Sequence, residues 1–252
     1  MTALLRALSA ESLKLRGTLA LWMCAVAPAV VVVVYVLQIT FSEFRGARPA
    51  PGEAWPLFTQ ATLALWGFLM VPLFVTLQAA LLAALEHNGN QWKHLLALSP
   101  PRHVHYLAKL LALAGMLVLA QLAMAALLPL GGWVLMQVKP SFGMTGAPPW
   151  GLMFERLAVM SAATLLLVAL HTWISIRWRS FAVAVGIGMG ATVMGFLIGQ
   201  SARFGPWYPW SLPVQALASD PGRSGQVMLY SLAGAALVTL AGLWEFRRAE
   251  YA

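Results

Sequence analysis

The chain has 252 residues, of which 60% are hydrophobic and only 10% are charged. A soluble domain carries about 25% charged residues, so this composition excludes a soluble globular protein and predicts an integral membrane protein. The net charge of +8 does not indicate nucleic-acid binding, because the basic residues lie at the edges of apolar segments, where they hold cytoplasmic loops inside. Cys24 is the single cysteine, which rules out an intramolecular disulfide and argues against a cysteine-based metal site.

The first segment, residues 1–17, alternates leucines with charged residues such as Arg6, Glu11 and Lys14. This pattern predicts a short amphipathic helix that lies in the membrane interface before the first span. The alternative is a simple basic flank. The apolar run that begins at Thr18 is too long for the apolar region of a signal peptide, so we expect it to be a retained span.

Six apolar segments are long enough to cross the bilayer as helices. They cover residues of about 18–40, 57–85, 106–136, 152–176, 181–200 and 226–244. Pro72 predicts a tilt or kink in the second span, and a tight turn at 177–180 separates the fourth span from the fifth. The sequence therefore predicts an all-α polytopic membrane protein with six transmembrane helices in one domain, 1–252.

The distribution of lysine and arginine predicts the orientation of these spans. With the N-terminus inside, the inner segments hold ten basic residues and the outer segments hold six. The inner ten are Arg6, Lys14, Arg16, Lys93, Arg102, Lys109, Arg177, Arg179, Arg247 and Arg248. Because basic residues are enriched in cytoplasmic loops, both termini are predicted to be cytoplasmic.

The cytoplasmic loop 86–105 between the second and third spans is predicted to contain a short amphipathic helix. A turn signal at 88–90 precedes residues 91–98, whose spacing places Trp92, Leu95 and Leu96 on one helical face. The prolines at 100 and 101 end the helix. Its apolar face must be buried either in the membrane surface or in a groove on a partner protein.

Four histidines lie in or near this loop: His87, His94, His103 and His105. Imidazole is a common metal ligand, but the chain has no H-E-x-x-H pattern, so we predict no metal site. His171 lies within the fourth span. It either lines a path through the bundle or, as we expect, bonds a backbone carbonyl.

The fifth span contains two G-x-x-x-G spacings, Gly186/Gly190 and Gly195/Gly199. Small residues let helices approach closely in lipid, so these glycines predict either a contact with another subunit or packing inside the chain. The outer loop 201–225 is rich in aromatic residues and proline, with Trp207, Tyr208, Pro209 and Trp210 in a row. It forms either a gate that dips back into the outer leaflet or an ordinary aromatic belt.

The stretch from Glu86 to Lys109 resembles permease subunits of ABC-2-type transporters, especially the lantibiotic-immunity branch. The shared features are the glutamate at the end of the second span, the Trp92–Pro100 segment, Arg102 and Lys109. The outer stretch 208–213 is also similar to the family. One departure is Ser-Pro-Pro at 99–101, where the family more often has Leu-Pro-Val.

The resemblance implies that 91–98 is a coupling helix that docks on a separate ATP-binding-cassette ATPase subunit, with Glu86 at the junction that conveys motion. The residues implied in coupling are Glu86, Trp92, Lys93, His94, Leu95, Leu96, Leu98 and Arg102. Trp92 could instead anchor in the interface. The resemblance also implies a dimer, either of two copies or of one copy with a homologous permease.

The chain has no G-x-x-x-x-G-K-[ST] sequence, so ATP and Mg are expected on the partner subunit and no cofactor is expected in this chain. The predicted function is export, across the bacterial cytoplasmic (inner) membrane, of a hydrophobic or amphipathic substrate such as a lantibiotic-like peptide, which would give self-protection. Small drugs, ions or lipids are alternative cargoes. A membrane-embedded enzyme is a further alternative, but none of the eight acidic residues lies in the middle of a predicted span, which argues against it.

Overall fold

A computed structural model describes residues 3–42, 49–50, 52–87, 101–218 and 220–248. Six helices in these ranges are long and apolar enough to cross a membrane. They are α2 (Leu19–Phe41), α3 (Ala54–Leu65) continued through η1 (Trp66–Met70) into α4 (Val71–His87), α6 (Arg102–Val138), α7 (Trp150–Arg177), α8 (Phe181–Ile198) and α10 (Pro221–Arg248). The remaining elements are α1 (Ala3–Leu15), η2 (Pro140–Phe142), η3 (Gly205–Trp207) and α9 (Leu212–Gln215). Every regular element in the described ranges is helical, which confirms the predicted all-α class with six spans.

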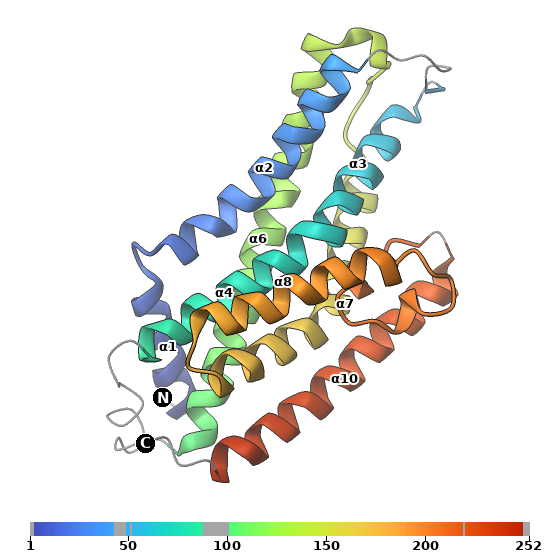
Figure 1. Cartoon of the computed structure of the whole chain (residues 1–252). Coiled ribbons are helices and arrows are strands. Elements are labelled where there is room, and N and C mark those ends of the chain that lie inside the picture. Colours follow the sequence, from blue (N-terminus) through green and yellow to red (C-terminus); the bar gives the residue numbers. More distant parts are fainter. Residues whose placement is uncertain (1–2, 43–48, 51, 88–100, 219, 249–252) are drawn as a thin grey trace.

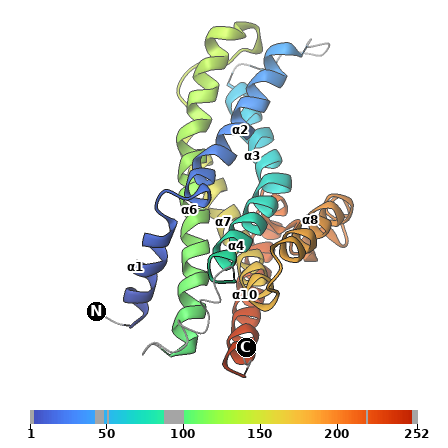
Figure 2. The same cartoon turned by 60° about the vertical axis from the view of Figure 1, so that its left-hand side comes forward.

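The second span bends at a π-helical segment, η1 (Trp66–Met70), which ends two residues before Pro72. Proline has no N–H, so the carbonyl four residues earlier loses its helical partner and the local hydrogen-bond pattern shifts. The change of direction between α3 and α4 is visible in Figure 2. The irregularity expected at Pro72 therefore takes the form of a wider helical turn.

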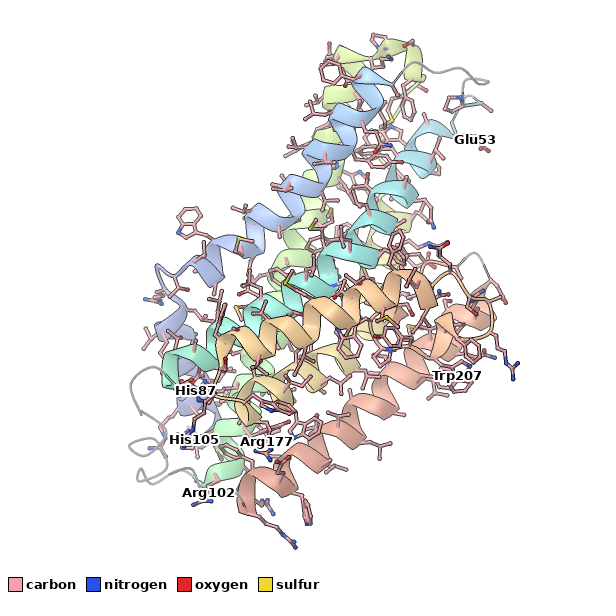
Figure 3. The ribbon with its side chains drawn as sticks, in the orientation of Figure 1. Glu53, His87, Arg102, His105, Arg177 and Trp207 are labelled. Carbon is pink, nitrogen blue, oxygen red and sulfur yellow. The ribbon has the colours of Figure 1, made fainter. Side chains whose placement is uncertain are left out.

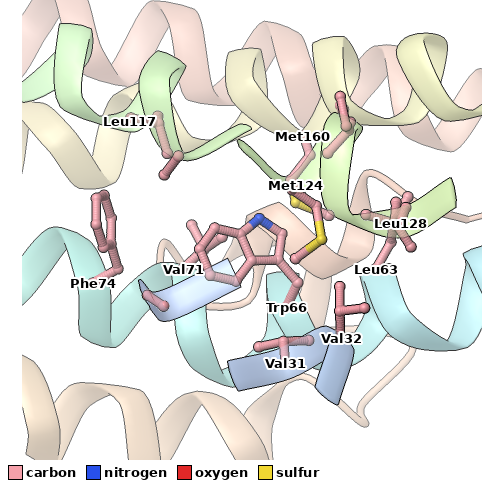
Figure 4. Packing of buried hydrophobic residues seen from close by; sticks show 14 of the residues in the cluster. Val31, Val32, Leu63, Trp66, Val71, Phe74, Leu117, Met124, Leu128 and Met160 are labelled. Carbon is pink, nitrogen blue, oxygen red and sulfur yellow. The ribbon is translucent and has the colours of Figure 1, made fainter. Parts of the chain in front are cut away.

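The apolar core of the bundle surrounds Trp66, which is fully buried. Figure 4 shows its indole ring among side chains from several helices, including Val31, Val32, Leu63, Met124 and Leu128. The indole N–H donates a hydrogen bond of 2.8 Å to Oε1 of Gln121 on α6. A polar group at membrane depth needs such a partner, since lipid offers none.

Helices α8 and α10 lie at the periphery of the bundle. α10 packs mainly on α7, and α8 mainly on α4. Both helices leave large apolar side chains exposed, among them Val193 and Leu197 on α8 and Leu237 and Leu240 on α10. Such surfaces face lipid or a second membrane subunit.

Both described ends of the chain lie at the same end of the bundle (Figure 1). We call this the termini end: α1 begins there, α4 and α10 end there, and α6 starts there. α1 packs against α6 (Figure 2). The segment 199–220 between the fifth and sixth spans lies at the opposite end of α8 and α10, which we call the loop end.

Candidate functional site

Four charged side chains form a group at the termini end, which we call the charge cluster: Glu11, Lys14, Glu86 and Lys109. All are buried except Lys14, whose side chain is 30% exposed. The Lys109 ammonium lies 2.5 Å from Oε2 of Glu86 and 3.4 Å from Oε2 of Glu11. The Lys14 ammonium lies 2.9 Å from Oε1 of Glu86 and 2.8 Å from Oε1 of Glu11. Each lysine therefore bridges both carboxylates, and the cluster is neutral.

The charge cluster joins three helices that are distant in the sequence. Glu86 lies in the last turn of α4, Lys109 lies two turns into α6, and Glu11 and Lys14 lie one turn apart on α1. The Glu86 side chain is 0% exposed and that of Lys109 is 4% exposed. At this burial a charge without a partner is strongly unfavourable, so each ionised group depends on the others.

The two α1 residues show how strongly the cluster favours the charged forms. Burial alone raises the pKa of the Glu11 carboxyl, but the nearby charges and hydrogen bonds of Lys109 and Lys14 outweigh it and hold that pKa below its usual 4.5. Burial alone lowers the pKa of the Lys14 amine, but its bonds to Glu11 and Glu86 raise that pKa above its usual 10.5. Both groups are therefore ionised at neutral pH.

Further contacts at the termini end hold α10 to α6 and α7. Nη1 of Arg102 donates to the carbonyl of Arg247 at 3.3 Å. Nε of Arg177 lies 2.6 Å from Oε1 of Glu245, which also accepts a 2.6 Å bond at Oε2 from the indole of Trp173. Figure 3 shows His87, Arg102 and His105 at this end, far from Trp207 at the loop end.

The predicted coupling residues Trp92, Lys93, His94, Leu95, Leu96 and Leu98 lie outside the described residues. The two coupling residues on either side of them are described. Glu86 is in the charge cluster, one residue before the end of α4, and Arg102 is the first residue of α6. The helices that enter and leave the predicted coupling segment are therefore joined to each other, and to α1, by the cluster.

Side chains at the loop end donate to backbone carbonyls of the irregular segment and of α8. The Tyr208 hydroxyl donates to the carbonyl of Ala191 at 2.9 Å, and Nε2 of Gln215 donates to that of Gly199 at 2.7 Å. Nη1 of Arg156, from α7, donates to the carbonyls of Leu217 and Ala218 at 3.1 and 3.3 Å. The Pro209 carbonyl accepts from the backbone N–H of Leu212 at 3.4 Å. Buried backbone carbonyls outside regular helices require such partners.

Trp210 shows that this loop packs against the fourth and fifth spans. Its ring lies 5.6 Å, edge to face, from the ring of the fully buried His171 on α7. Nε2 of His171 lies 3.1 Å from the hydroxyl oxygen of Thr76. That hydroxyl oxygen also lies 2.8 Å from the Pro72 carbonyl. The partner that the structure gives His171 is thus a hydroxyl, where a backbone carbonyl was expected.

The two glycine pairs of α8 lie in different surroundings. A methyl group on Gly186 or Gly190 would meet no atom of another residue within 4 Å. On Gly195 it would meet Trp210 at 3.2 Å, and on Gly199 it would meet Phe68 at 3.1 Å. The second pair therefore lets α8 approach the loop and the second span, whereas the first pair lies on an open face.

Residues 7–195 match the family described as ABC-2 family transporter protein. The match covers about three quarters of the chain and includes the charge cluster, the first four spans and α8 as far as Gly195. The chain belongs to the ABC-2 transporter family. No curated protein matches the sequence.

Membership in the ABC-2 family makes this chain the permease type of transporter component, a multi-pass membrane protein. Permeases of this family work with ATP-binding-cassette ATPase subunits. The loop end beyond residue 195 and α10 lie outside the matched range. The lantibiotic-immunity branch stays a prediction.

The sequence identified Glu86 but did not assign Glu11 or Lys14 to the site. Two signals were present. Glu11 and Lys14 are spaced three residues apart, as in an ion pair along one helical face. Lys109 lies seven residues into the long apolar segment that begins at Arg102, where a charge is expected to face a partner inside the bundle. Neither signal shows that α1 folds back onto α6.

Proposed function

We propose that this ABC-2 permease is the membrane-spanning subunit of an exporter driven by ATP that a separate subunit hydrolyses. That subunit docks on the segment 91–98, and its motion reaches the membrane through the charge cluster. The observation that carries this proposal is that buried ion pairs join the helices on both sides of the segment, α4 and α6, to α1.

The chemistry of the cluster suits the transmission of movement. Separating Glu86 from Lys109 would take from each buried ion the nearer of its two partners, and moving α4 away from both lysines would leave the Glu86 carboxylate buried without a partner, which is unfavourable by several kcal/mol. The end of α4 and the start of α6 therefore move together rather than independently. Since Lys14 and Lys109 also bind Glu11, α1 moves with them. A displacement of the docking segment thus shifts three helices as one unit.

The apolar outer faces support a second permease and a hydrophobic cargo. Gly186 and Gly190 lie on an open face of α8, where another helix can approach closely. A groove of about 300 Å³ lies beside this helix and is lined by Phe68, Leu73, Val193 and other apolar residues. Such a groove accommodates an apolar part of a hydrophobic or amphipathic substrate, for example a lantibiotic-like peptide, better than a sugar.

Co-purification tests the proposal. The chain is co-expressed with the ATP-binding-cassette subunit encoded nearest to it, in the cytoplasmic membrane of a bacterium. We expect the subunit to co-purify with the wild-type chain and to be lost with Trp92→Ala or Leu95→Asp. Trp207→Ala, at the loop end, serves as a matched aromatic control and should retain the subunit. Equal recovery with all three variants, or no recovery with the wild type, would contradict the docking role.

A further inference from the structure

A second site lies at the loop end, away from the charge cluster. A pocket of about 350 Å³ opens between the loop that follows α8 and the first three turns of α10. Its lining includes six residues with polar or aromatic side chains: Arg203, Trp207, Asp220, Arg223, Gln226 and Tyr230. The pocket brings together two arginines from different segments, which the proposed transport function does not use.

The charges of the lining favour an anion. Asp220 accepts a 2.9 Å bond at Oδ1 from the backbone N–H of Gly222, so its carboxylate caps the start of α10. The two arginines leave the lining with a net charge of +1. One guanidinium N–H of Arg223 donates to Oε1 of Gln215 at 2.6 Å, while its buried Nε has no partner among the described residues.

Arg203 is the freer of the two arginines. Its guanidinium carbon lies 5.4 Å from the centre of the Phe204 ring, and no described residue forms an ion pair or hydrogen bond with it. A guanidinium presents N–H donors in a fork that matches the oxygens of a phosphate. The two side chains therefore offer donors to an anion that enters the pocket.

The position of the pocket along α10 indicates its depth in the membrane. The helix starts with Pro-Gly-Arg-Ser-Gly-Gln at 221–226 and becomes apolar only from Val227 onward. The ring of Trp207, which is 63% exposed, stacks on that of Tyr230 with 4.3 Å between centroids. Tryptophan and tyrosine favour the headgroup level of the bilayer. The pocket therefore opens where the polar part of α10 meets its apolar part.

We propose that this pocket binds the phosphate of an anionic phospholipid, with Arg203 and Arg223 contacting the phosphate and the Trp207–Tyr230 pair lying beside the glycerol backbone. The bound lipid holds the loop 199–220 at the membrane surface. This lipid site does not depend on the proposed coupling to ATP hydrolysis, so the two proposals are tested independently. A soluble phosphate presents the same anionic group, and the experiment below separates the two sources.

Lipid titration of the full-length chain tests the site. The delipidated protein in non-ionic detergent is titrated with phosphatidylglycerol, phosphatidylcholine or glycerol 3-phosphate, and binding is followed by native mass spectrometry. We expect phosphatidylglycerol to bind more tightly than the other two probes. Arg203→Gln should weaken phosphatidylglycerol binding about fivefold, the effect of one basic residue near an anionic membrane surface. Asp220→Asn, which keeps a capping side chain, should strengthen it.

The control is Arg248→Gln, at the other end of α10. Arg248 also lies over an aromatic ring, with its guanidinium carbon 4.2 Å from the centre of the Trp244 ring. This variant should leave phosphatidylglycerol binding unchanged. Arg203 has no hydrogen bond within the described fold, so Arg203→Gln should keep the wild-type melting temperature. The proposal would be overturned if glycerol 3-phosphate bound as tightly as phosphatidylglycerol. It would also be overturned if Arg203→Gln bound phosphatidylglycerol as tightly as the wild type does.

Discussion

The two ends of the bundle solve the problem of buried polar groups in different ways. At the termini end, side chains of opposite charge pair with one another across α1, α4 and α6. At the loop end, side chains such as Tyr208 and Gln215 donate to backbone carbonyls. The first arrangement depends on several charges at once and links distant helices, whereas the second holds one loop in place through separate bonds. Perturbing the first end should therefore affect the whole bundle, and perturbing the second should act locally.

The largest expected effect is that of Glu86→Leu. It leaves two lysines to share the single carboxylate of Glu11, one of them in a buried position. Removing one partner of a buried pair costs about 3–5 kcal/mol, so thermal unfolding in detergent should show a strong loss of stability. Glu245→Gln is the control, because its ion pair with Arg177 is partly exposed and such pairs contribute at most about 1 kcal/mol.

A double variant shows whether the instability of Glu86→Leu comes from an unpaired charge or from altered packing. Glu86→Met combined with Lys109→Met removes one negative and one positive charge and leaves Glu11 paired with Lys14. Apolar replacement of a whole buried pair is often neutral or stabilising, so the double variant should recover most of the stability that Glu86→Leu loses. A double variant that is less stable than Glu86→Leu would contradict the account of the charge cluster.

The next largest effect is expected at the loop end, from Gly199→Ala. The new methyl group would lie 2.6 Å from the carbonyl oxygen of Gly195 and 3.1 Å from Ser211. Overpacking of this kind costs about 1–3 kcal/mol, which should lower the melting temperature. Gly190→Ala is the matched control on the same helix, where nothing lies within 4 Å. Equal melting temperatures for the two variants would show that α8 is not held against the loop.

Loss of a single hydrogen bond to the loop should lower the stability by less than the overpacking at Gly199 does. Tyr208→Phe removes the donor to the Ala191 carbonyl while keeping the ring, so unfolding should become easier by about 1 kcal/mol. Limited proteolysis should detect faster cleavage within 199–220 and unchanged cleavage at the termini end. Equal acceleration at both ends would contradict a local role for this bond.

The smallest effect is expected from pH. The lowered pKa of Glu11 means that its contribution to stability is complete above pH 4.5 and is lost as the pH falls through the lowered value. The raised pKa of Lys14 means that its contribution is complete below pH 10.5 and is lost as the pH rises through the raised value. For each group, burial shifts the pKa in the direction opposite to the ion pairs, so the net pKa shift is the difference between the two effects. The difference in melting temperature between the wild type and Glu11→Gln should therefore be constant between about pH 5 and pH 10 and should decrease as the pH falls below 4.5.

Composition and apolar length were enough to predict the all-α fold and its six spans, because crossing the lipid requires a minimum apolar length of every helix. Glu86 and Lys109 were recognisable as charges at the edges of apolar segments. The pairing of these residues with Glu11 and Lys14 was not predictable, since it depends on α1 packing on α6 rather than lying apart from the bundle. The contact of Trp210 with His171 was missed for the same reason: it joins residues 39 positions apart through the packing of an irregular loop.

The most direct test of the central claim is ATP hydrolysis by the partner subunit when it is reconstituted with the permease in nanodiscs. The Glu86→Met/Lys109→Met double variant keeps the docking segment 91–98 but no longer links α4 to α6 through an ion pair. The account predicts that this variant still binds the ATPase subunit but loses the change in hydrolysis rate that the wild-type permease produces. A double variant that binds the subunit and alters its hydrolysis rate as the wild type does would contradict the claim that the charge cluster transmits the motion.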